Sequence, residues 1–269
     1  MVRDDKLFKL HRILKRMRSV LVVFSGGADS AFLLKTAKDI LKNNLWAVTV
    51  FSDFLPESER RHAVWFAEMV HVPHIIVKYK PGPRVMKNPP NRCYYCKKEG
   101  FSHMRDIARE KGIRCVIDGS NADDLKDFRP GKKALRELKI RSPLQEAGMT
   151  KSDVRLFSRR LGLRTWNKPS NPCLASRFPY GEIITRKKLR MVEEAEEYMR
   201  ETGFCGMRVR HHGSAARIEV SEKDIFLLVK NRKKISRKLR EIGFSYIAAD
   251  LDGYRQGALN EVFPWKRKK

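Results

Sequence analysis

The first half of the chain alternates between short apolar runs and longer stretches in which apolar residues recur every three or four positions. The runs cover residues 20–24, 46–51, 74–78 and 115–118, and the stretches between them cover residues 30–42, 57–70 and 97–111. Uninterrupted apolar runs of this length indicate buried parallel strands, and the recurring pattern indicates amphipathic helices. The alternation predicts βαβ units and therefore an α/β fold with a doubly wound parallel sheet.

The pattern changes in the second half. Thr150 to Asp153 have capping-box spacing, which predicts a helix ending near Gly162. The proline-rich stretch 168–181 cannot continue a helix. Beyond it the sequence predicts a helix at 187–201, short strands at 207–210 and 216–220, helices within 221–242 and a last strand at 246–250. We therefore expect two domains, residues 1–182 and a smaller α+β domain at 183–269 for substrate binding or oligomerisation.

A glycine-rich turn lies between the first predicted strand and the first predicted helix. It reads Ser25-Gly26-Gly27-Ala28-Asp29-Ser30. Adjacent glycines let the backbone approach a ligand, and a helix N-terminus favours an anion, most often phosphate. The two serines can donate hydrogen bonds, and Asp29 can hold a magnesium ion bridging phosphate oxygens. The alternative is an ordinary Gly-Gly turn with a Ser/Asp helix cap.

Two further loops leave the carboxyl ends of predicted strands. One begins at Ser52, and the other runs from Asp118 through Gly119 to Asp124. Because ligands of doubly wound sheets bind at the carboxyl ends of the strands, we expect these loops and the glycine-rich turn to converge on one nucleotide. The alternative for Asp123 and Asp124 is that they form an Asx turn.

Composition narrows the class of protein. The 269 residues include 58 Lys and Arg against 31 Asp and Glu, a net charge of +27. That charge attracts anions, so nucleic acid is a possible partner, although no basic segment is interleaved with aromatic residues. No apolar run approaches the ~20 residues that a membrane span needs, and the charged N-terminus lacks the apolar core of a signal peptide. We expect a cytoplasmic protein with no membrane contact.

The cysteines suggest a metal or cluster site. Cys93 and Cys96 form a CxxC motif, and Cys173 lies in the proline-rich stretch. Three thiolates suit a 4Fe-4S cluster with one open iron, whereas a fourth zinc-type ligand is not evident. The alternative for the CxxC is a structural turn. Cys115 and Cys205 are expected to be packing residues, since free cysteine is commonly buried.

Motifs spread over nearly the whole chain carry a family resemblance. They are residues 25–30 (SGGADS), 91–98 (NRCYYCKK), 121–124 (NADD), 128–131 (FRPG), 141–144 (RSPL), 168–181 (KPSNPCLASRFPYG), 210–213 (RHHG), 216–220 (ARIEV) and 250–261 (DLDGYRQGALNE). This ordered set resembles the LarE family of the PP-loop ATP pyrophosphatase superfamily. The set is specific as a whole, because SGGxDS alone is shared by many PP-loop enzymes.

The resemblance implies an ATP-dependent sulfur transferase. Such an enzyme adenylylates the carboxylates of a pyridinium biscarboxylate mononucleotide and converts them to thiocarboxylates, a step toward the nickel-pincer nucleotide cofactor. Some members sacrifice the sulfur of a cysteine matching Cys173. Others carry three cysteines, matching Cys93, Cys96 and Cys173, and bind a 4Fe-4S cluster that delivers sulfide. All three are present here, which favours the cluster type, with a sulfide donor and a homo-oligomer as expected partners.

Charged residues near Cys173 and in the tail complete the predicted site. Arg177 is expected to favour the Cys173 thiolate or to hold an anionic substrate, with a solvated loop arginine as the alternative. Glu219 is expected to take part in catalysis, with substrate or metal binding, or simple surface pairing, as the alternatives. Arg210, Arg217, Asp252 and Arg255 are candidates for binding substrate or metal, or simply for surface pairing. His211 and His212 are expected at the surface, pointing to opposite faces of a strand.

Two other functions remain open from the sequence. A tRNA thiolase would share the PP-loop, the cysteines and the cluster, and the charge of +27 would suit RNA. However, the chain has no recognisable RNA-binding motif, and its tail matches the LarE pattern. A non-catalytic ATP- or RNA-binding protein is the third hypothesis, against which the intact SGGADS motif and the pair Asp29 and Asp124 argue.

Overall fold

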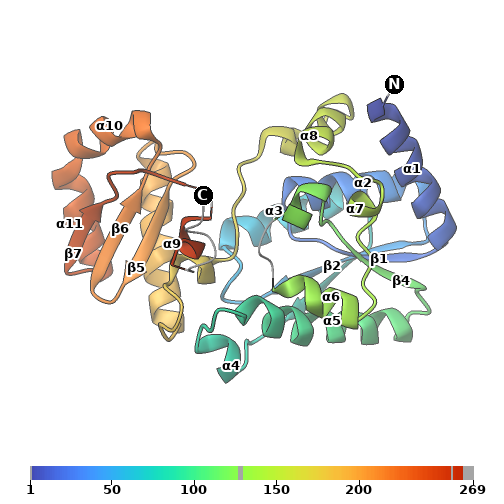
Figure 1. The fold of residues 1–269 in the computed structure, drawn as a ribbon, viewed down its shortest axis with the longest axis horizontal. Coiled ribbons are helices and arrows are strands. Elements are labelled where there is room, and N and C mark those ends of the chain that lie inside the picture. Colours follow the sequence, from blue (N-terminus) through green and yellow to red (C-terminus); the bar gives the residue numbers. More distant parts are fainter. Residues whose placement is uncertain (1, 127–129, 256, 263–269) are drawn as a thin grey trace. The chain divides into compact units, whose positions relative to one another are not determined.

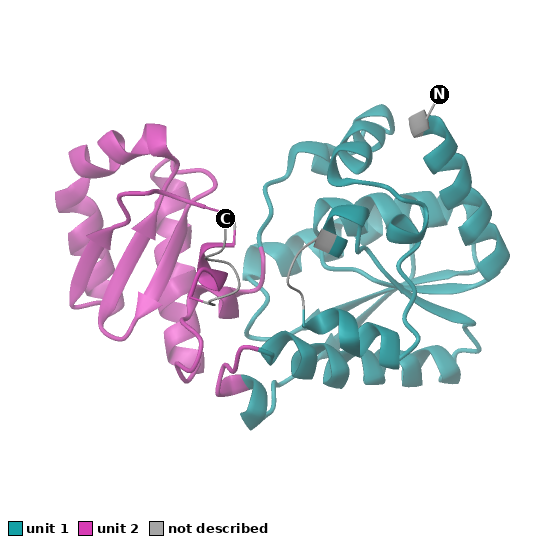
Figure 2. Ribbon diagram, in the orientation of Figure 1, with its two compact units in different colours: residues 1–85, 91–171 teal, residues 86–90, 172–269 magenta. Residues whose placement is uncertain are grey.

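The computed structural model describes residues 2–126, 130–255 and 257–262. The motif residues Phe128, Arg129 and Gln256 lie outside these ranges. The chain forms two compact units (Figure 2), unit 1 with Met1–Val85 and Asn91–Asn171 and unit 2 with Met86–Pro90 and Pro172–Lys269. The main change of unit thus falls between Asn171 and Pro172, earlier than the boundary expected after Glu182, and the domain limits 1–182 and 183–269 stay a prediction.

Unit 1 is built on a parallel sheet. Its strands are β1 (Val20–Val23), β2 (Leu45–Phe51), β3 (His74–Lys78) and β4 (Cys115–Asp118), in the order β3-β2-β1-β4. Val20 at the start of β1 pairs with Leu45 on one side and with Cys115 on the other. The four strands and their parallel arrangement confirm the sequence prediction, and all carboxyl ends lie at one edge of the sheet (Figure 1).

Helices cover both faces of this sheet. The helices are α1 (Val2–Met17), α2 (Ala28–Leu41), α3 (Glu57–Met69), α4 (Pro83–Met86), α5 (Arg92–Glu110), α6 (Gly131–Glu137), α7 (Pro143–Glu146) and α8 (Lys151–Arg160). Alternate β1 residues face opposite sides: Val20 and Val22 pack with α1, α2, α3 and α8, whereas Leu21 packs with α5 and α6. The expected doubly wound α/β fold is therefore confirmed.

Two helical regions differ from the sequence expectation. The charged N-terminus forms α1, whose Leu7, Leu10, Leu14 and Met17 make an apolar stripe against the core. Helix α5 begins at Arg92 rather than near residue 97, so the CxxC opens a helix instead of forming a turn before it. The predicted cap of α8 is present, since Thr150 and Asp153 form a reciprocal capping box.

Unit 2 contains a mixed three-stranded sheet. Its elements are α9 (Arg186–Glu201), β5 (Arg208–His212), β6 (Ala215–Glu219), α10 (Ile225–Lys230), α11 (Arg232–Ile242) and β7 (Tyr246–Ala249). Strand β6 is antiparallel to β5 and parallel to β7, and the expected helical region 221–242 is divided at Asn231. Helix α9 packs on β5, and α11 packs on α9 and β7. This arrangement confirms the expected smaller α+β domain.

The segment Met86–Pro90 belongs to unit 2 although it lies between β3 and α5 in the sequence. Asn88 is fully buried, and its amide nitrogen donates a hydrogen bond of 2.6 Å to the Pro179 carbonyl. The Gly181 N–H donates to the Asn88 carbonyl, and the Ile184 N–H donates to the Met86 carbonyl. The chain therefore passes between the units three times, after residues 85, 90 and 171.

None of the helices in the described parts of the chain combines the length and apolar character that crossing a membrane requires. The cytoplasmic location stays a prediction.

Candidate active site

The SGGADS turn connects β1 directly to α2. Gly26 has a φ of +76°, and a Cβ there would lie 3.2 Å from the Glu59 carbonyl oxygen, so both conformation and space require glycine. Gly27 is extended and is the N-cap of α2. The first N–H groups of this 14-residue helix therefore lie at the carboxyl edge of the sheet, where they can bind an anion.

The two serines of the turn contact each other. Their hydroxyl oxygens are 3.1 Å apart, and the buried Ser30 hydroxyl also donates to the Gly27 carbonyl at 3.1 Å. The Ser25 N–H approaches the Ser30 hydroxyl at 3.4 Å. Ser30 therefore shapes the turn from inside, whereas Ser25 is exposed and is the hydroxyl placed for a ligand.

The loop after β4 is bound to the same turn. The Asn121 amide donates to the Asp29 carboxylate at 3.1 Å, and its oxygen accepts from the N–H groups of Asp123 and Asp124. The Asp124 carboxylate accepts from the Asn121 N–H at 3.0 Å, and that of Asp123 accepts from the Lys151 N–H. The side chain that closes an Asx turn here is Asn121, whereas Asp124 binds back to the Asn121 N–H and Asp123 binds the loop to the start of α8. Asp29 faces this loop, and the nucleotide-binding role expected for Asp124 stays a prediction.

Gly119 shows how closely the two loops approach. A Cβ at this position would lie 3.0 Å from both the backbone nitrogen and the Cα of Ser30. We expect Gly119→Ala to lower the free energy of unfolding by about 1–3 kcal/mol through overpacking, and to weaken ATP binding. Urea unfolding and nucleotide titration measure both effects.

Gly100→Ala is the matched control for that substitution. Gly100 lies inside α5, and a Cβ there would meet no heavy atom of a neighbouring element within 4 Å, so alanine should be neutral or slightly stabilising. Equal behaviour of the two variants would contradict the close approach of the loops.

The loop after β2 is held to the start of α3 by hydrogen bonds that Ser52 accepts. The Ser52 hydroxyl accepts from the Phe54 N–H at 3.3 Å, and the Ser52 carbonyl accepts from the Arg60 guanidinium at 2.7 Å. Both bonds join Ser52 to residues close to it in the sequence, Phe54 and Arg60. The role in nucleotide binding expected for Ser52 stays a prediction.

Two buried carboxylates lie beside the turn; the sequence placed Asp118 in the β4 loop without giving it a role of its own, and it did not single out Glu59. Asp118 at the end of β4 accepts from the hydroxyls of Ser120 and Ser142 at 2.7 and 2.6 Å, and lies 3.7 Å from the Lys97 ammonium. Glu59 on α3 accepts from the Lys168 ammonium at 2.8 Å. An aspartate directly at a strand end was a usable signal for Asp118, but no sequence pattern pairs Glu59 with Lys168.

The cysteines of the CxxC lie at the start of α5, with Cys93 exposed and Cys96 half-buried. Positions three apart on a helix are neighbours on its surface, so the two sulfur atoms can reach one ligand. Tyr79 lies beside Cys96 and donates a hydrogen bond to Glu99. Burial, that bond and the nearby Cys96 raise the pKa of Tyr79, so its hydroxyl stays protonated.

Cys173 is exposed and is the N-cap of the 3-10 helix Leu174–Arg177 in unit 2. None of the five cysteines, all of which are described, forms a disulfide. Within residues 2–126, 130–255 and 257–262, no three His, Cys, Asp or Glu side chains gather as a metal site. Cys93 and Cys96 belong to unit 1 and Cys173 to unit 2, so the three-cysteine set stays a prediction.

Arg177 is buried and fixes the loop that carries Cys173. Its guanidinium makes two bonds of 2.9 Å to the Glu196 carboxylate and donates to the Pro172 carbonyl at 2.7 Å. Burial opposes the charge, yet the Glu196 carboxylate raises the pKa of Arg177. The solvated-arginine alternative is therefore wrong, and these contacts describe a residue that positions Cys173; a direct catalytic role stays a prediction.

Glu196 supplies a test of this anchor. Removing one partner of a buried ion pair leaves an uncompensated charge, so Glu196→Ala should lower the free energy of unfolding by about 3–5 kcal/mol. Glu197→Ala, on the exposed side of α9, should change it by less than ~0.5 kcal/mol. Urea unfolding compares them, and similar losses in both variants would contradict the anchor.

Glu219 is also buried and fully engaged. Arg210 binds both of its oxygens at 2.9 and 2.7 Å, and Arg217 donates to one of them at 2.9 Å. Arg210 also donates to the Ser176 carbonyl at 2.8 Å, which connects this pair to the Cys173 loop. Arg255 pairs with Asp252 at 3.1 Å on the surface. The catalytic role expected for Glu219 stays a prediction.

Comparison with known proteins decides the family. The chain is 40% identical to the pyridinium-3,5-bisthiocarboxylic acid mononucleotide synthase of Lactiplantibacillus plantarum over 254 residues. The matched region is 93% of this chain and 91% of that protein. The chain belongs to the LarE family. LarE enzymes are ATP-dependent sulfur-inserting enzymes of the PP-loop superfamily, so the resemblance and the enzyme class are confirmed.

Two further relatives and one negative result complete the LarE comparison. The uncharacterized protein slr1717 of Synechocystis is 40% identical over 263 residues, 96% of this chain and 98% of that protein. A tRNA(Ile)-lysidine synthase of Bdellovibrio bacteriovorus is 23% identical over 241 residues, 84% of this chain and 68% of that protein. No family model matches the chain.

Two minor expectations for this LarE chain are wrong. Cys205 is exposed rather than a packing residue, whereas Cys115 packs against the core of unit 1 as expected. His211 is buried, with its ring against Phe178 and Phe244, and only His212 is at the surface. Burial lowers the pKa of His211, which favours the neutral ring. The two histidines do point to opposite faces of β5.

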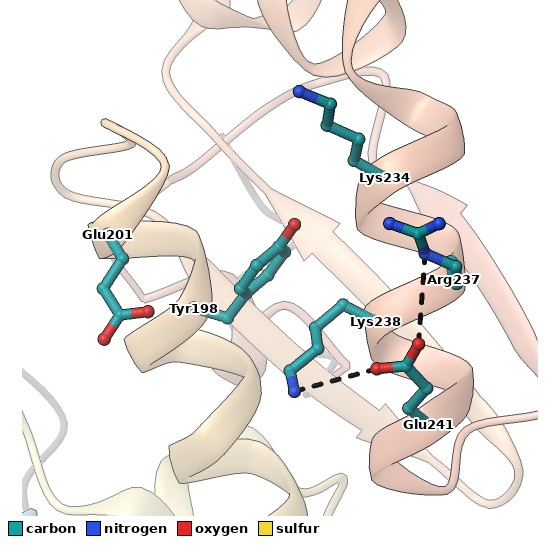
Figure 3. Close-up of a pocket in the computed structure, with 6 residues that line it drawn as sticks. All are labelled: Tyr198, Glu201, Lys234, Arg237, Lys238 and Glu241. Carbon is teal, nitrogen blue, oxygen red and sulfur yellow. Dashed lines mark ion pairs between the residues drawn. The ribbon is translucent and has the colours of Figure 1, made fainter.

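A charged groove lies between α9 and α11 of unit 2 (Figure 3). It measures about 470 Å³ and is lined by Tyr198, Glu201, Lys234, Arg237, Lys238 and Glu241. Glu241 pairs with Arg237 at 3.9 Å and with Lys238 at 3.7 Å. Part of the charge of the groove is thus neutralised internally.

Proposed function

We propose that this chain uses ATP to adenylylate the carboxylates of a pyridinium biscarboxylate mononucleotide and converts them to thiocarboxylates for the nickel-pincer nucleotide cofactor. One observation carries the proposal: this chain is 40% identical to the synthase over nearly its whole length, and its SGGADS turn and β4 loop are joined at the start of α2. The thiocarboxylate product is the one that this relative makes, and a biscarboxylate is the substrate from which sulfur insertion would give it.

In the first step, a substrate carboxylate oxygen attacks the α-phosphorus of ATP. A phosphorus–oxygen bond forms, and the bond to the β-phosphate breaks as pyrophosphate leaves with its electron pair. The N–H groups at the start of α2 and the Ser25 hydroxyl donate to the phosphates, where charge develops. Asp29 offers a carboxylate to magnesium, which, when bound, would neutralise phosphate charge.

In the second step, sulfur replaces the activated oxygen. A sulfur nucleophile attacks the acyl carbon, and AMP departs with the former carboxylate oxygen. Cys173 is an exposed thiol at the end of a loop held by Arg177, which suits it to approach a bound substrate. If Cys173 itself gives up its sulfur, breaking its Cβ–S bond with loss of the Cα proton leaves dehydroalanine.

We further propose that Cys93, Cys96 and Cys173 hold a 4Fe-4S cluster. The donor set fits: three thiols outside any disulfide, two of them one helical turn apart and two of them exposed. When bound, such a cluster would carry the sulfide for transfer and spare Cys173. Anaerobic purification with a visible and EPR spectrum and an iron and sulfide count tests this set.

The proposed activity is tested by incubating the purified chain with ATP, magnesium, the pyridinium mononucleotide and sulfide. Pyrophosphate release together with the mass of the thiocarboxylate product is the expected result. Pyrophosphate release without any sulfur in the product under anaerobic conditions would overturn the sulfur transfer. Light scattering, in the same preparation, tests the proposed homo-oligomer.

A tRNA thiolase is the second candidate. The net charge of +27 and the distant similarity to a tRNA(Ile)-lysidine synthase favour it. RNA that co-purifies with the chain, and sulfur incorporated into tRNA rather than into the mononucleotide, would select it. Pyrophosphate release from ATP would in either case exclude the non-catalytic scaffold.

A further inference from the structure

The SGGADS turn is in direct contact with the segment that leads to Cys173. The Lys168 ammonium donates to the Gly26 carbonyl at 3.0 Å and to the Glu59 carboxylate at 2.8 Å. Lys168 is five positions before Cys173 in the sequence. The contact therefore joins the predicted phosphate-binding backbone to the start of the cysteine segment.

Glu59 is the centre of this connection. Its carboxylate is buried, and its second oxygen accepts from the Asn171 amide at 3.2 Å. Burial and the nearby Lys168 ammonium lower the pKa of the neighbouring His62, so its ring stays neutral and the ion pair is the main charge interaction there. One buried carboxylate thus binds both ends of the segment 168–171.

Because the chain is covalent, fixing the segment 168–171 also restricts the position of Cys173. Asn171 is the last residue of unit 1 and is two positions before Cys173, so their Cα atoms are at most ~7.6 Å apart. Pro169 and Pro172 restrict the backbone between these points. Fixing Lys168 and Asn171 therefore limits where the Cys173 sulfur can go.

We propose that Glu59 is a positioning residue that aligns the Cys173 segment with the adenylylated substrate by binding Lys168 and Asn171 at the SGGADS turn. The inference rests on the proposed function, since it concerns the transfer step of that reaction. Adenylylation depends on the turn itself, whereas sulfur transfer depends on the segment. Loss of Glu59 should therefore separate the two steps, and the acyl-adenylate should be lost to water.

The experiment measures sulfur incorporated per pyrophosphate released. For Glu59→Gln we expect pyrophosphate release within about twofold of the unchanged protein, and a ratio of sulfur to pyrophosphate reduced about tenfold or more, since small misplacements of reacting groups are costly. Lys168→Met should behave alike, and Lys168→Arg should restore part of the ratio because it keeps a cationic donor. Asn171→Ala removes only one of the two contacts with Glu59, so the ratio of sulfur to pyrophosphate should fall less.

The control is Glu57→Gln, which alters a carboxylate on the same turn of α3 that pairs with Arg60 at the surface. It should leave both measurements unchanged. An unchanged ratio in Glu59→Gln and Lys168→Met would overturn the inference, as would equal falls in both steps, which indicate a merely structural role. Should Glu59→Gln fail to fold, Asn171→Ala decides, and an unchanged ratio there also overturns it. Failure of the unchanged protein to release pyrophosphate would instead reject the proposed function.

Discussion

Replacing Cys173 with alanine is expected to abolish thiocarboxylate formation, by on the order of a thousandfold or more, while ATP-dependent pyrophosphate release continues. The reason is that Cys173 is needed in both possible sulfur routes, as the donor itself or as a cluster ligand. The SGGADS turn does not include it, so activation of the carboxylate should be independent of it. Product mass and pyrophosphate release, measured on one sample, separate the two steps.

The CxxC variants decide between the two routes. With a cluster, Cys93→Ala and Cys96→Ala should be as inactive in sulfur transfer as Cys173→Ala, and the unchanged protein should turn over repeatedly with sulfide. Cys205→Ser is the matched control, because Cys205 is an exposed thiol outside the predicted set. A mass loss of one hydrogen sulfide at Cys173 in the unchanged protein, with Cys93→Ala still active, would refute the cluster.

Asp29→Ala is expected to reduce pyrophosphate release at least about a hundredfold while the protein stays folded. Asp29 lies in the first turn of α2, where phosphate and magnesium are expected, and its carboxylate accepts a hydrogen bond from the neutral Asn121 amide. The loss should therefore be catalytic and should leave thermal unfolding nearly unchanged. Pyrophosphate release over a range of ATP and magnesium concentrations measures it.

Asp39→Ala is the control for that variant. Asp39 lies on the same helix, pairs with Lys35 and is exposed, so its removal should affect neither stability nor activity. Undiminished pyrophosphate release in Asp29→Ala would refute the assignment of the SGGADS turn as the ATP site.

The parallel sheet of unit 1 could be predicted because its strands are buried on both faces. Such strands appear as apolar runs, and β3 and β4 match the predicted limits. Helix α1 was missed because its charged residues outnumber the four that form its apolar stripe. The start of α5 was missed because two cysteines and two tyrosines have low helix propensity, although the N-cap residue Asn91 is of a type common at helix starts.

The candidate site could be predicted where local chemistry is sufficient. The glycine turn needs a positive φ at Gly26 and close approach at Gly119, and both requirements are visible as glycines in the sequence. The pairing of Glu59 with Lys168 joins residues 109 positions apart, and no local pattern encodes it. In the same way, only the folded chain shows that Arg177 and Glu219 are buried ion-pair partners rather than exposed charges.

The segment Met86–Pro90 has a consequence for synthesis of the protein. The ribosome synthesises this segment early. Its hydrogen-bond partners, which lie within residues 178–184, emerge only after all of unit 1 has been made. Unit 1 can therefore fold on the nascent chain, whereas unit 2 must wait and then assemble from two separate pieces. A fragment that starts at Pro172 would leave the Gly181 and Ile184 N–H groups without their native acceptors, however faithfully the rest of its sheet formed.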